Sequence, residues 1–127
     1  MPELPPANPP VRGRLWRSFG YAFRGVKAML VLQANARLHA LATVVVIALG
    51  IILGLARWEW CAVIGAIGLV WAAEGVNSAL ESLTDLVSPG EHPLAGRAKD
   101  IAAGAVLCAA GAAAVIGFIV FFPHLIP

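Results

Sequence analysis

Charged side chains are scarce in this sequence. They account for 13% of its 127 residues, whereas ordinary soluble proteins carry about 25%. The net charge is +2, and the charges are not clustered as a nucleic-acid partner would require. Hydrophobic residues make up 60% of the chain, more than a soluble core of this size can bury. The composition excludes a soluble domain, and the long apolar runs exclude a disordered chain. It predicts a small integral membrane protein.

Cysteine is also rare. Cys61 and Cys108 both lie inside apolar runs, far apart in the sequence and without metal-ligand spacing. We expect both to be small buried hydrophobic residues. A P-loop and a Gly-rich kinase loop are absent from the sequence. A cleavable signal peptide is not expected, because the first 37 residues hold six Lys or Arg and no long apolar segment.

The N-terminal part divides into a leader and an amphipathic helix. Residues 1–13 are expected to form a flexible leader, and five of the first ten residues are proline. From about 14 to 33, apolar residues recur at steps of three and four while Arg and Lys occupy the other faces. The apolar set is Leu15, Trp16, Phe19, Phe23, Val26 and Leu30. This pattern predicts an interfacial helix whose rings enter the headgroup boundary while its cations stay with anionic lipid.

Three apolar segments follow, at about 37–56, 60–86 and 98–122. Residues 38–56 carry no formal charge, and as a helix they would span roughly 28 Å, close to the ~30 Å hydrocarbon core. Trp58 and Trp60 mark a short interfacial turn, and Pro123 is expected to end the third helix. Residues 14–127 are therefore predicted to form a single all-α membrane domain, with a surface helix and three transmembrane helices.

The distribution of positive charge predicts the orientation. Six Lys or Arg precede the first span, and Arg97 and Lys99 follow the second, whereas the turn between the first two spans has only Arg57. The positive-inside rule places the N-terminus and the polar loop at residues 81–100 in the cytoplasm, and the C-terminus outside.

Small residues favour close helix packing. Gly50 and Gly54 form a small-xxx-small pair in the first span, and Gly104, Gly111 and Gly117 lie in the third. Three thin helices leave little room for an internal site. We therefore expect a homo-oligomer, with sites formed where protomers meet.

A polar stripe marks the second span and its exit. At 100° per residue, its members fall within an arc of about 100° on one side of a helix. They are Glu74, Asn77, Ser78, Glu81 and Asp85. A carboxylate within the hydrocarbon is costly and normally implies a pathway or a site. Carboxylates this close repel one another unless they share a cation or a proton, and Mg²⁺ is the hard, oxygen-seeking candidate.

The loop after the stripe supplies groups of the opposite sign. Arg97 and Lys99 are placed to meet phosphate oxygens just ahead of a helix N-terminus. Asp100 is expected either to cap the third span or to contact the ligand.

These motifs resemble a known family. The string Glu74-Gly-Val-Asn77-Ser-Ala-Leu-Glu81, followed by Asp85 and by Arg97-Ala-Lys99-Asp100, resembles the small prokaryotic diacylglycerol kinase family, which includes the undecaprenol kinases of Gram-positive bacteria. The resemblance extends over about residues 14–123. The segments Trp58-Glu59-Trp60 and Asn35-x-Arg37-x-His39 are more similar to the undecaprenol kinase branch.

The resemblance implies a homotrimeric kinase of the bacterial inner membrane that uses ATP and Mg²⁺ to phosphorylate a lipid hydroxyl at the cytoplasmic interface, feeding lipid recycling. Glu74 would be the general base, Asn77 would orient the phosphate or the base, and Glu81 would bind the metal. Contacts to the nucleotide would come from Arg14, Tyr21, Asp85, Glu91, His92, Lys99 and Asp100. Contacts to the lipid would come from Arg14, Lys27, Asn35 and Glu74.

One departure from the family pattern is Gln33, which stands where the family usually has a second metal-binding Glu. An amide oxygen can bind Mg²⁺, but it lacks the negative charge of a carboxylate, so it should bind the ion more weakly. Three options follow: a metal site completed by another carboxylate such as Asp85, a single tighter metal, or reduced activity.

Two other classes of function compete with a kinase. A small oligomeric transporter would use Glu74 as its ion or substrate site, but this leaves the rest of the stripe and the cluster at residues 97–100 without a role. A catalytically silent family member is the second alternative. The acceptor itself is undecaprenol or diacylglycerol, with undecaprenol favoured by the branch resemblance.

Overall fold

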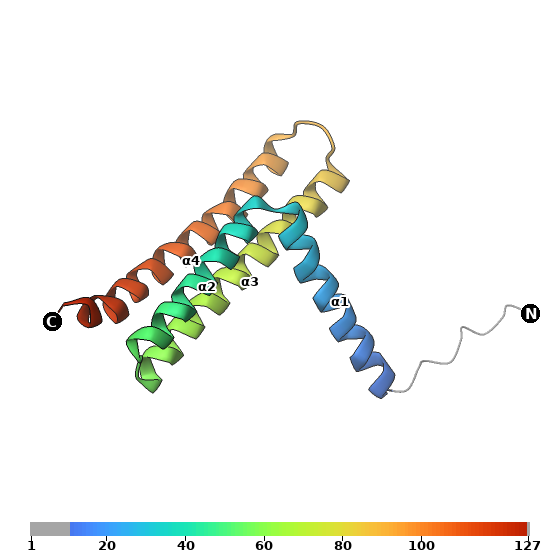
Figure 1. Cartoon of the computed structure of the whole chain (residues 1–127). Helices are drawn as coiled ribbons and strands as arrows, with labels where there is room; N and C mark the ends of the chain where they lie inside the picture. The colour runs from blue at the N-terminus through green and yellow to red at the C-terminus, as the bar shows by residue number, and fades with distance from the viewer. Residues whose placement is uncertain (1–10, 127) are drawn as a thin grey trace, which may run out of the picture.

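The computed structural model describes residues 11–126, and this part of the chain is built from four helices. They are α1 (Val11–Leu32), α2 (Ala34–Leu53), α3 (Arg57–Val87) and α4 (Pro93–Leu125). Helices α2, α3 and α4 run alongside one another, whereas α1 leaves them at a steep angle (Figure 1). The predicted leader falls mainly on residues 1–10, outside the described part, and residues 11–13 already belong to α1.

Helices α2, α3 and α4 are each long and apolar enough to cross a membrane. By length and composition they correspond to the three predicted spans. The predicted polar loop at residues 81–100 is wrong in extent, because helix continues to Val87 and resumes at Pro93. The charged residues there lie on helix faces, and only residues 88–92 form the turn.

The turn between α2 and α3 requires a glycine at one position. Gly54 has φ 69°, in the left-handed region that favours glycine. Its N–H donates to the carbonyls of Gly50 and Ile51 and so ends α2. Gly54 is therefore a helix cap. The predicted small-xxx-small pair of Gly50 and Gly54 within the span is wrong, because Gly54 is the left-handed cap that follows α2 and not a member of the helix.

Gly50 does allow a close approach between α2 and α3. A Cβ added there would lie 2.8 Å from Cη2 of Trp60 and 3.0 Å from Cδ1 of Leu55. Leu55 belongs to a small buried core with Val63 and Val120. In contrast, a Cβ at Gly104, Gly111 or Gly117 of α4 would meet open space within this chain.

The far end of α4 is tied to the start of α3. Nε2 of His124 lies 2.9 Å from Oε1 of Glu59, and Oε2 of Glu59 accepts a hydrogen bond of 2.7 Å from the N–H of Ala56. Pro123 was expected to end α4, but the helix continues to Leu125. The proline removes a single donor near the helix end, and the His124–Glu59 contact holds the turn beyond it.

The outer surface of the bundle is apolar. Cys61 and Cys108 are both exposed on it, so the expectation that they are buried is wrong. An apolar run in the sequence does not distinguish a buried residue from a lipid-facing one, because a membrane-spanning helix is apolar on both sides. On α1, Trp16 and Phe23 are exposed, whereas Met29 and Leu30 near its end are half-buried.

Candidate functional site

The polar stripe lies on one face of α3, and its inner part is buried. Glu74 is 1% exposed, and Asn77 and Ser78 are also buried. Both carboxylate oxygens of Glu74, Oδ1 of Asn77 and Oγ of Ser78 have no hydrogen-bond partner among the described residues. Buried polar atoms are normally paired, and leaving a buried charge unpaired is expensive. These four atoms are therefore candidate contacts for a ligand.

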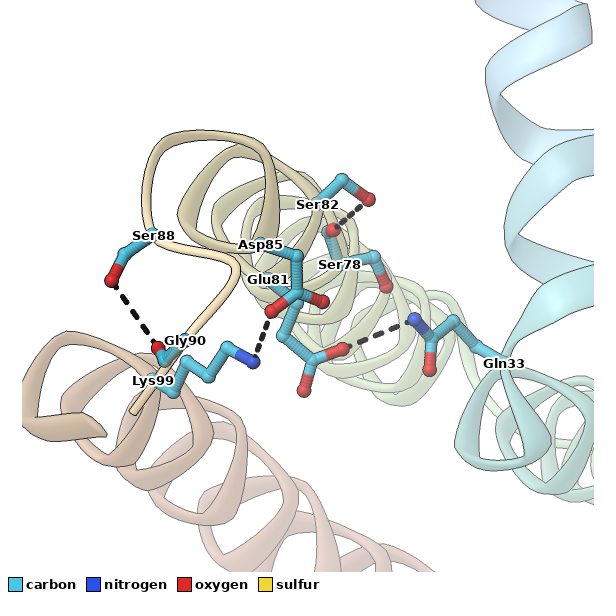
Figure 2. A network of polar contacts seen from close by, with 8 residues as sticks. All are labelled: Gln33, Ser78, Glu81, Ser82, Asp85, Ser88, Gly90 and Lys99. Carbon is cyan, nitrogen blue, oxygen red and sulfur yellow. Dashed lines mark hydrogen bonds and ion pairs between the residues drawn. The ribbon is translucent and has the colours of Figure 1, made fainter. Parts of the chain in front are cut away.

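Glu81 is held one turn beyond the buried group. Its Oε2 accepts a hydrogen bond of 3.1 Å from Nε2 of Gln33 (Figure 2). Gln33 is the extended residue between α1 and α2, and its side chain makes no cap bond to α2, so the amide can reach α3. The structure thus brings together the two residues predicted to share a metal.

Asp85 and Lys99 form an ion pair of 2.5 Å between α3 and α4. The pair is partly open to solvent, with Asp85 66% and Lys99 38% exposed. In Figure 2 it lies beside Glu81, and the Lys99 side chain points from α4 toward α3. Asp85 is therefore already neutralised by Lys99, which makes it a poor candidate to complete a metal site with Glu81.

The turn at residues 88–92 borders a pocket of about 610 Å³. Its walls include Asp85 from α3, Glu91 from the turn and Lys99 from α4. His92 caps α4, because its Nδ1 accepts a hydrogen bond of 3.1 Å from the N–H of Leu94. Pro93 follows at the first helical position, where its missing N–H is harmless.

The cap at His92 corrects two expectations. Asp100 does not cap the third span, since it lies within α4 and is exposed. Arg97 and Lys99 also lie within the helix and not ahead of its N-terminus. The proline at 93 was the signal for this earlier start, because proline is favoured in the first turn of a helix.

The remaining predicted residues lie outside the buried stripe. Arg14, Tyr21 and Lys27 are exposed on α1, Asn35 is exposed at the start of α2, and Glu91 is exposed in the turn. The guanidinium of Arg24 lies 4.7 Å above the ring of Tyr21. Ser78 belongs to the predicted stripe, but the sequence assigns it no role. Its position four residues after Glu74 places it on the same face of the helix and so indicates that it belongs to the buried site.

Among residues 11–126, the structure contains no group of three or more His, Cys, Asp or Glu that could hold a metal ion. The predicted metal pair, Glu81 and Gln33, brings a single carboxylate together with one amide. Other ligands would have to come from a substrate or another protomer.

Comparison with known proteins identifies relatives of this chain. The family model described as prokaryotic diacylglycerol kinase matches residues 20–121, which contain the stripe and the turn. Undecaprenol kinase of Bacillus subtilis is 37% identical over 88% of this chain and 91% of the relative. Diacylglycerol kinase of Synechocystis sp. is 38% identical over 96% of this chain and 74% of the relative. Diacylglycerol kinase of Escherichia coli K12 is 29% identical over 87% of this chain and 91% of the relative.

Proposed function

The chain belongs to the prokaryotic diacylglycerol kinase family and is a lipid kinase. From this premise we propose that it transfers the γ-phosphoryl group of ATP to the hydroxyl of a membrane lipid. We propose further that undecaprenol is preferred over diacylglycerol as the acceptor. The observation that supports the proposal most is the buried Glu74, whose two oxygens are unpaired within the described chain. The preference for undecaprenol follows the relative in Bacillus subtilis and the branch resemblance of residues 35–39 and 58–60.

Phosphoryl transfer needs alignment of the two substrates and neutralised phosphate charge more than covalent chemistry. Glu74 would accept the proton of the lipid hydroxyl, since neither of its oxygens has a donor among residues 11–126. Asn77, one turn along the same face, would orient the phosphate or the base. Closure around these groups by the lipid would exclude water from the reaction.

The oxygens at Glu81 and Gln33 fit a hard divalent cation. One oxygen of Glu81 accepts from Gln33, which leaves the other Glu81 oxygen and the Gln33 amide oxygen as ligands. Mg²⁺ takes one or two protein carboxylates together with substrate phosphates. Bound there, it would neutralise charge on the phosphates of ATP.

The nucleotide would lie over the pocket at residues 88–92. Lys99 would exchange Asp85 for a phosphate oxygen, and Glu91 and His92, which line the pocket, would border the nucleotide. Asp100, the next residue after Lys99 and exposed on α4, would contact the nucleotide from the helix. Arg14 and Tyr21 would reach ATP from α1, and Arg14, Lys27 and Asn35 would contact the lipid headgroup. These assignments require α1 to lie in the interface with its five Lys and Arg toward anionic groups.

The whole molecule is proposed to be a homotrimer in the bacterial cytoplasmic membrane, with the N-terminus in the cytoplasm and the C-terminus outside. The small residues Gly104, Gly111 and Gly117 on α4 would allow close contact with a second copy. The unpaired atoms on α3 support a site completed by a neighbour.

A direct test offers both acceptors at once. Purified protein in mixed micelles would receive γ-labelled ATP, Mg²⁺, undecaprenol and diacylglycerol in equal amounts. We expect labelled undecaprenyl phosphate to exceed labelled phosphatidate. Predominant labelling of diacylglycerol would reverse the acceptor order, and absence of labelled lipid would identify a catalytically silent family member.

A further inference from the structure

The break between α1 and α2 lies in a stretch of sequence without a helix-breaking residue. α1 ends at Leu32 and α2 begins at Ala34, yet residues 26–49 contain neither glycine nor proline. Sharp bends in helices normally occur at proline, at glycine, or where a side chain enters the backbone hydrogen-bond ladder. A side chain in the ladder is therefore the cause to expect at this junction.

Arg37 supplies that side chain. In a continuous helix each carbonyl accepts from the N–H four residues later. In this structure the carbonyls of Leu30 and Val31 accept from Nη1 of Arg37, over 3.3 and 3.1 Å. The guanidinium thus replaces two of the backbone bonds that the break removes, and its positive charge lies at the negative end of α1.

The same break directs Gln33 to the candidate metal site. Its backbone is extended, with φ −109° and ψ 119°, and its Nε2 donates to Oε2 of Glu81 over 3.1 Å. Met29, at the end of α1, lies against α3, since its Sδ would be 3.6 Å from a Cβ at Gly75. If residues 29–37 formed one straight helix, Gln33 would take helical dihedral angles. α1 would then follow the axis of α2 in place of its steep angle (Figure 1).

We propose that Arg37 is a positioning residue, which holds the break between α1 and α2 and so presents the Gln33 amide to Glu81. The inference rests on the proposed function for its consequence, the binding of a divalent cation by Gln33 and Glu81. It adds a residue that acts through Gln33 and not on a substrate. It also gives a role to the middle residue of the segment Asn35-x-Arg37-x-His39.

A proline at position 34 tests this role directly. Ala34 is the first residue of α2 and is exposed, and Gln33 before it is already extended, as the residue before a proline prefers to be. Proline has no N–H to donate to the carbonyl of Leu30, so it prevents a continuous helix. Ala34→Pro should therefore restore the break in Arg37→Ala, although it restores neither the charge nor the donor of the arginine.

The distance between α1 and α3 measures the break without ATP, lipid or metal. One spin label would be attached at Gly20→Cys on α1 and one at Leu86→Cys at the end of α3, since both positions are exposed. The parent for these variants is the full-length chain with Cys61 and Cys108 changed to alanine. Dilution with unlabelled protein leaves one labelled pair in each assembly.

We expect Arg37→Ala to shift this distance by on the order of 10 Å, because about 20 Å of helix separates Gly20 from the break. Arg37→Lys, which keeps a cation able to donate to the same carbonyls, should stay near the parent. Arg37→Ala combined with Ala34→Pro should return to the parent distance. The matched control is Arg57→Ala, which removes an exposed arginine at the opposite turn and should change nothing. An unchanged distance in Arg37→Ala, or a shift that the proline does not reverse, would overturn the proposal.

The affinity for Mn²⁺, titrated by electron paramagnetic resonance without ATP, tests the consequence for Gln33. Residues that orient metal ligands change affinity by 10- to 100-fold. We therefore expect Arg37→Ala to bind Mn²⁺ on the order of tenfold more weakly than the parent, and Ala34→Pro to restore the affinity of that variant. A loss that the proline does not restore would overturn the link from Arg37 to Gln33. If the parent binds no Mn²⁺, the proposed metal pair is wrong, whereas the distance still decides whether Arg37 holds the break.

Discussion

Two buried glutamates of α3 have opposite surroundings. Both oxygens of Glu59 have partners, the N–H of Ala56 and the ring of His124, whereas both oxygens of Glu74 have none among residues 11–126. A paired carboxylate supports structure, and an unpaired one is available for chemistry. Because both glutamates are buried, burial alone does not distinguish a structural role from a chemical one. The hydrogen-bond partners of the carboxylate oxygens distinguish them.

This contrast gives a matched pair of variants. Glu74→Gln keeps the shape of the side chain and removes the base, so we expect phosphoryl transfer to fall at least ~100-fold, within the usual contribution of general base catalysis. Glu59→Gln changes the same residue type on the same helix and should retain most of the activity. The rate of lipid phosphorylation is measured for protein that elutes as the parent does from size exclusion. Near-normal turnover in Glu74→Gln would contradict the assignment of the base.

Substitutions of Gln33 test whether this residue and Glu81 bind a metal ion, and the quantity measured is the affinity for the metal. Its Nε2 now donates to Glu81. In Gln33→Glu a second carboxylate would face Glu81, and their repulsion would be relieved by a shared cation. We expect Mn²⁺ to bind on the order of tenfold more tightly than to the parent, since ligand charge tunes affinity. Titration of free Mn²⁺ by electron paramagnetic resonance, without ATP, measures this. Gln33→Ala is the control and should bind more weakly than the parent, while equal affinity in all three proteins would place the metal elsewhere.

At the scale of elements, the junction of α2 and α3 depends on two glycines for different reasons. Gly50 gives space to Trp60, and Gly54 supplies the left-handed cap. We expect Gly50→Ala to destabilise the protein by ~1–3 kcal/mol through overpacking. Gly65→Ala, on an exposed face of α3 where a Cβ meets open space within the chain, should be neutral or slightly stabilising. Unfolding by a denaturing detergent measures both, and equal stability of the two variants would show that the close approach at Gly50 carries no cost.

The sequence predicted the helices better than their ends. The three spans follow from long apolar runs, and the stripe follows from helical spacing, so both were predictable from residue order alone. The polar residues from Glu81 to Asp100 indicated a loop, but they lie on two helices that pair through Asp85 and Lys99. Periodicity describes one helix at a time, so a contact between α3 and α4, such as this ion pair, could not be predicted from it. The bond between Gln33 and Glu81 could be anticipated only from the family resemblance.

At the scale of the whole molecule, charge is concentrated at one end of the bundle. Lys99 and Arg97 lie near the turn at residues 88–92, and the five cations of α1 precede α2, whereas the opposite turn carries Arg57. Large apolar side chains cover the outer surface of the helices between these ends. The arrangement fits a bilayer crossed three times, with the candidate site on the more positive side.

Labelling of single cysteines from each side of the membrane tests the predicted orientation. In a variant with Cys61 and Cys108 changed to alanine, a single cysteine replaces either Gly90 in the turn at residues 88–92 or Leu125 at the end of α4, both exposed. Because positive loops stay in the cytoplasm, a membrane-impermeant maleimide should label Gly90→Cys in inverted vesicles and Leu125→Cys in intact spheroplasts. Labelling both sites after detergent lysis is the control for reactivity. The reverse pattern would put the stripe on the outer side, where ATP is not supplied, and would leave Glu74 and Glu81 without the nucleotide that the proposed reaction requires.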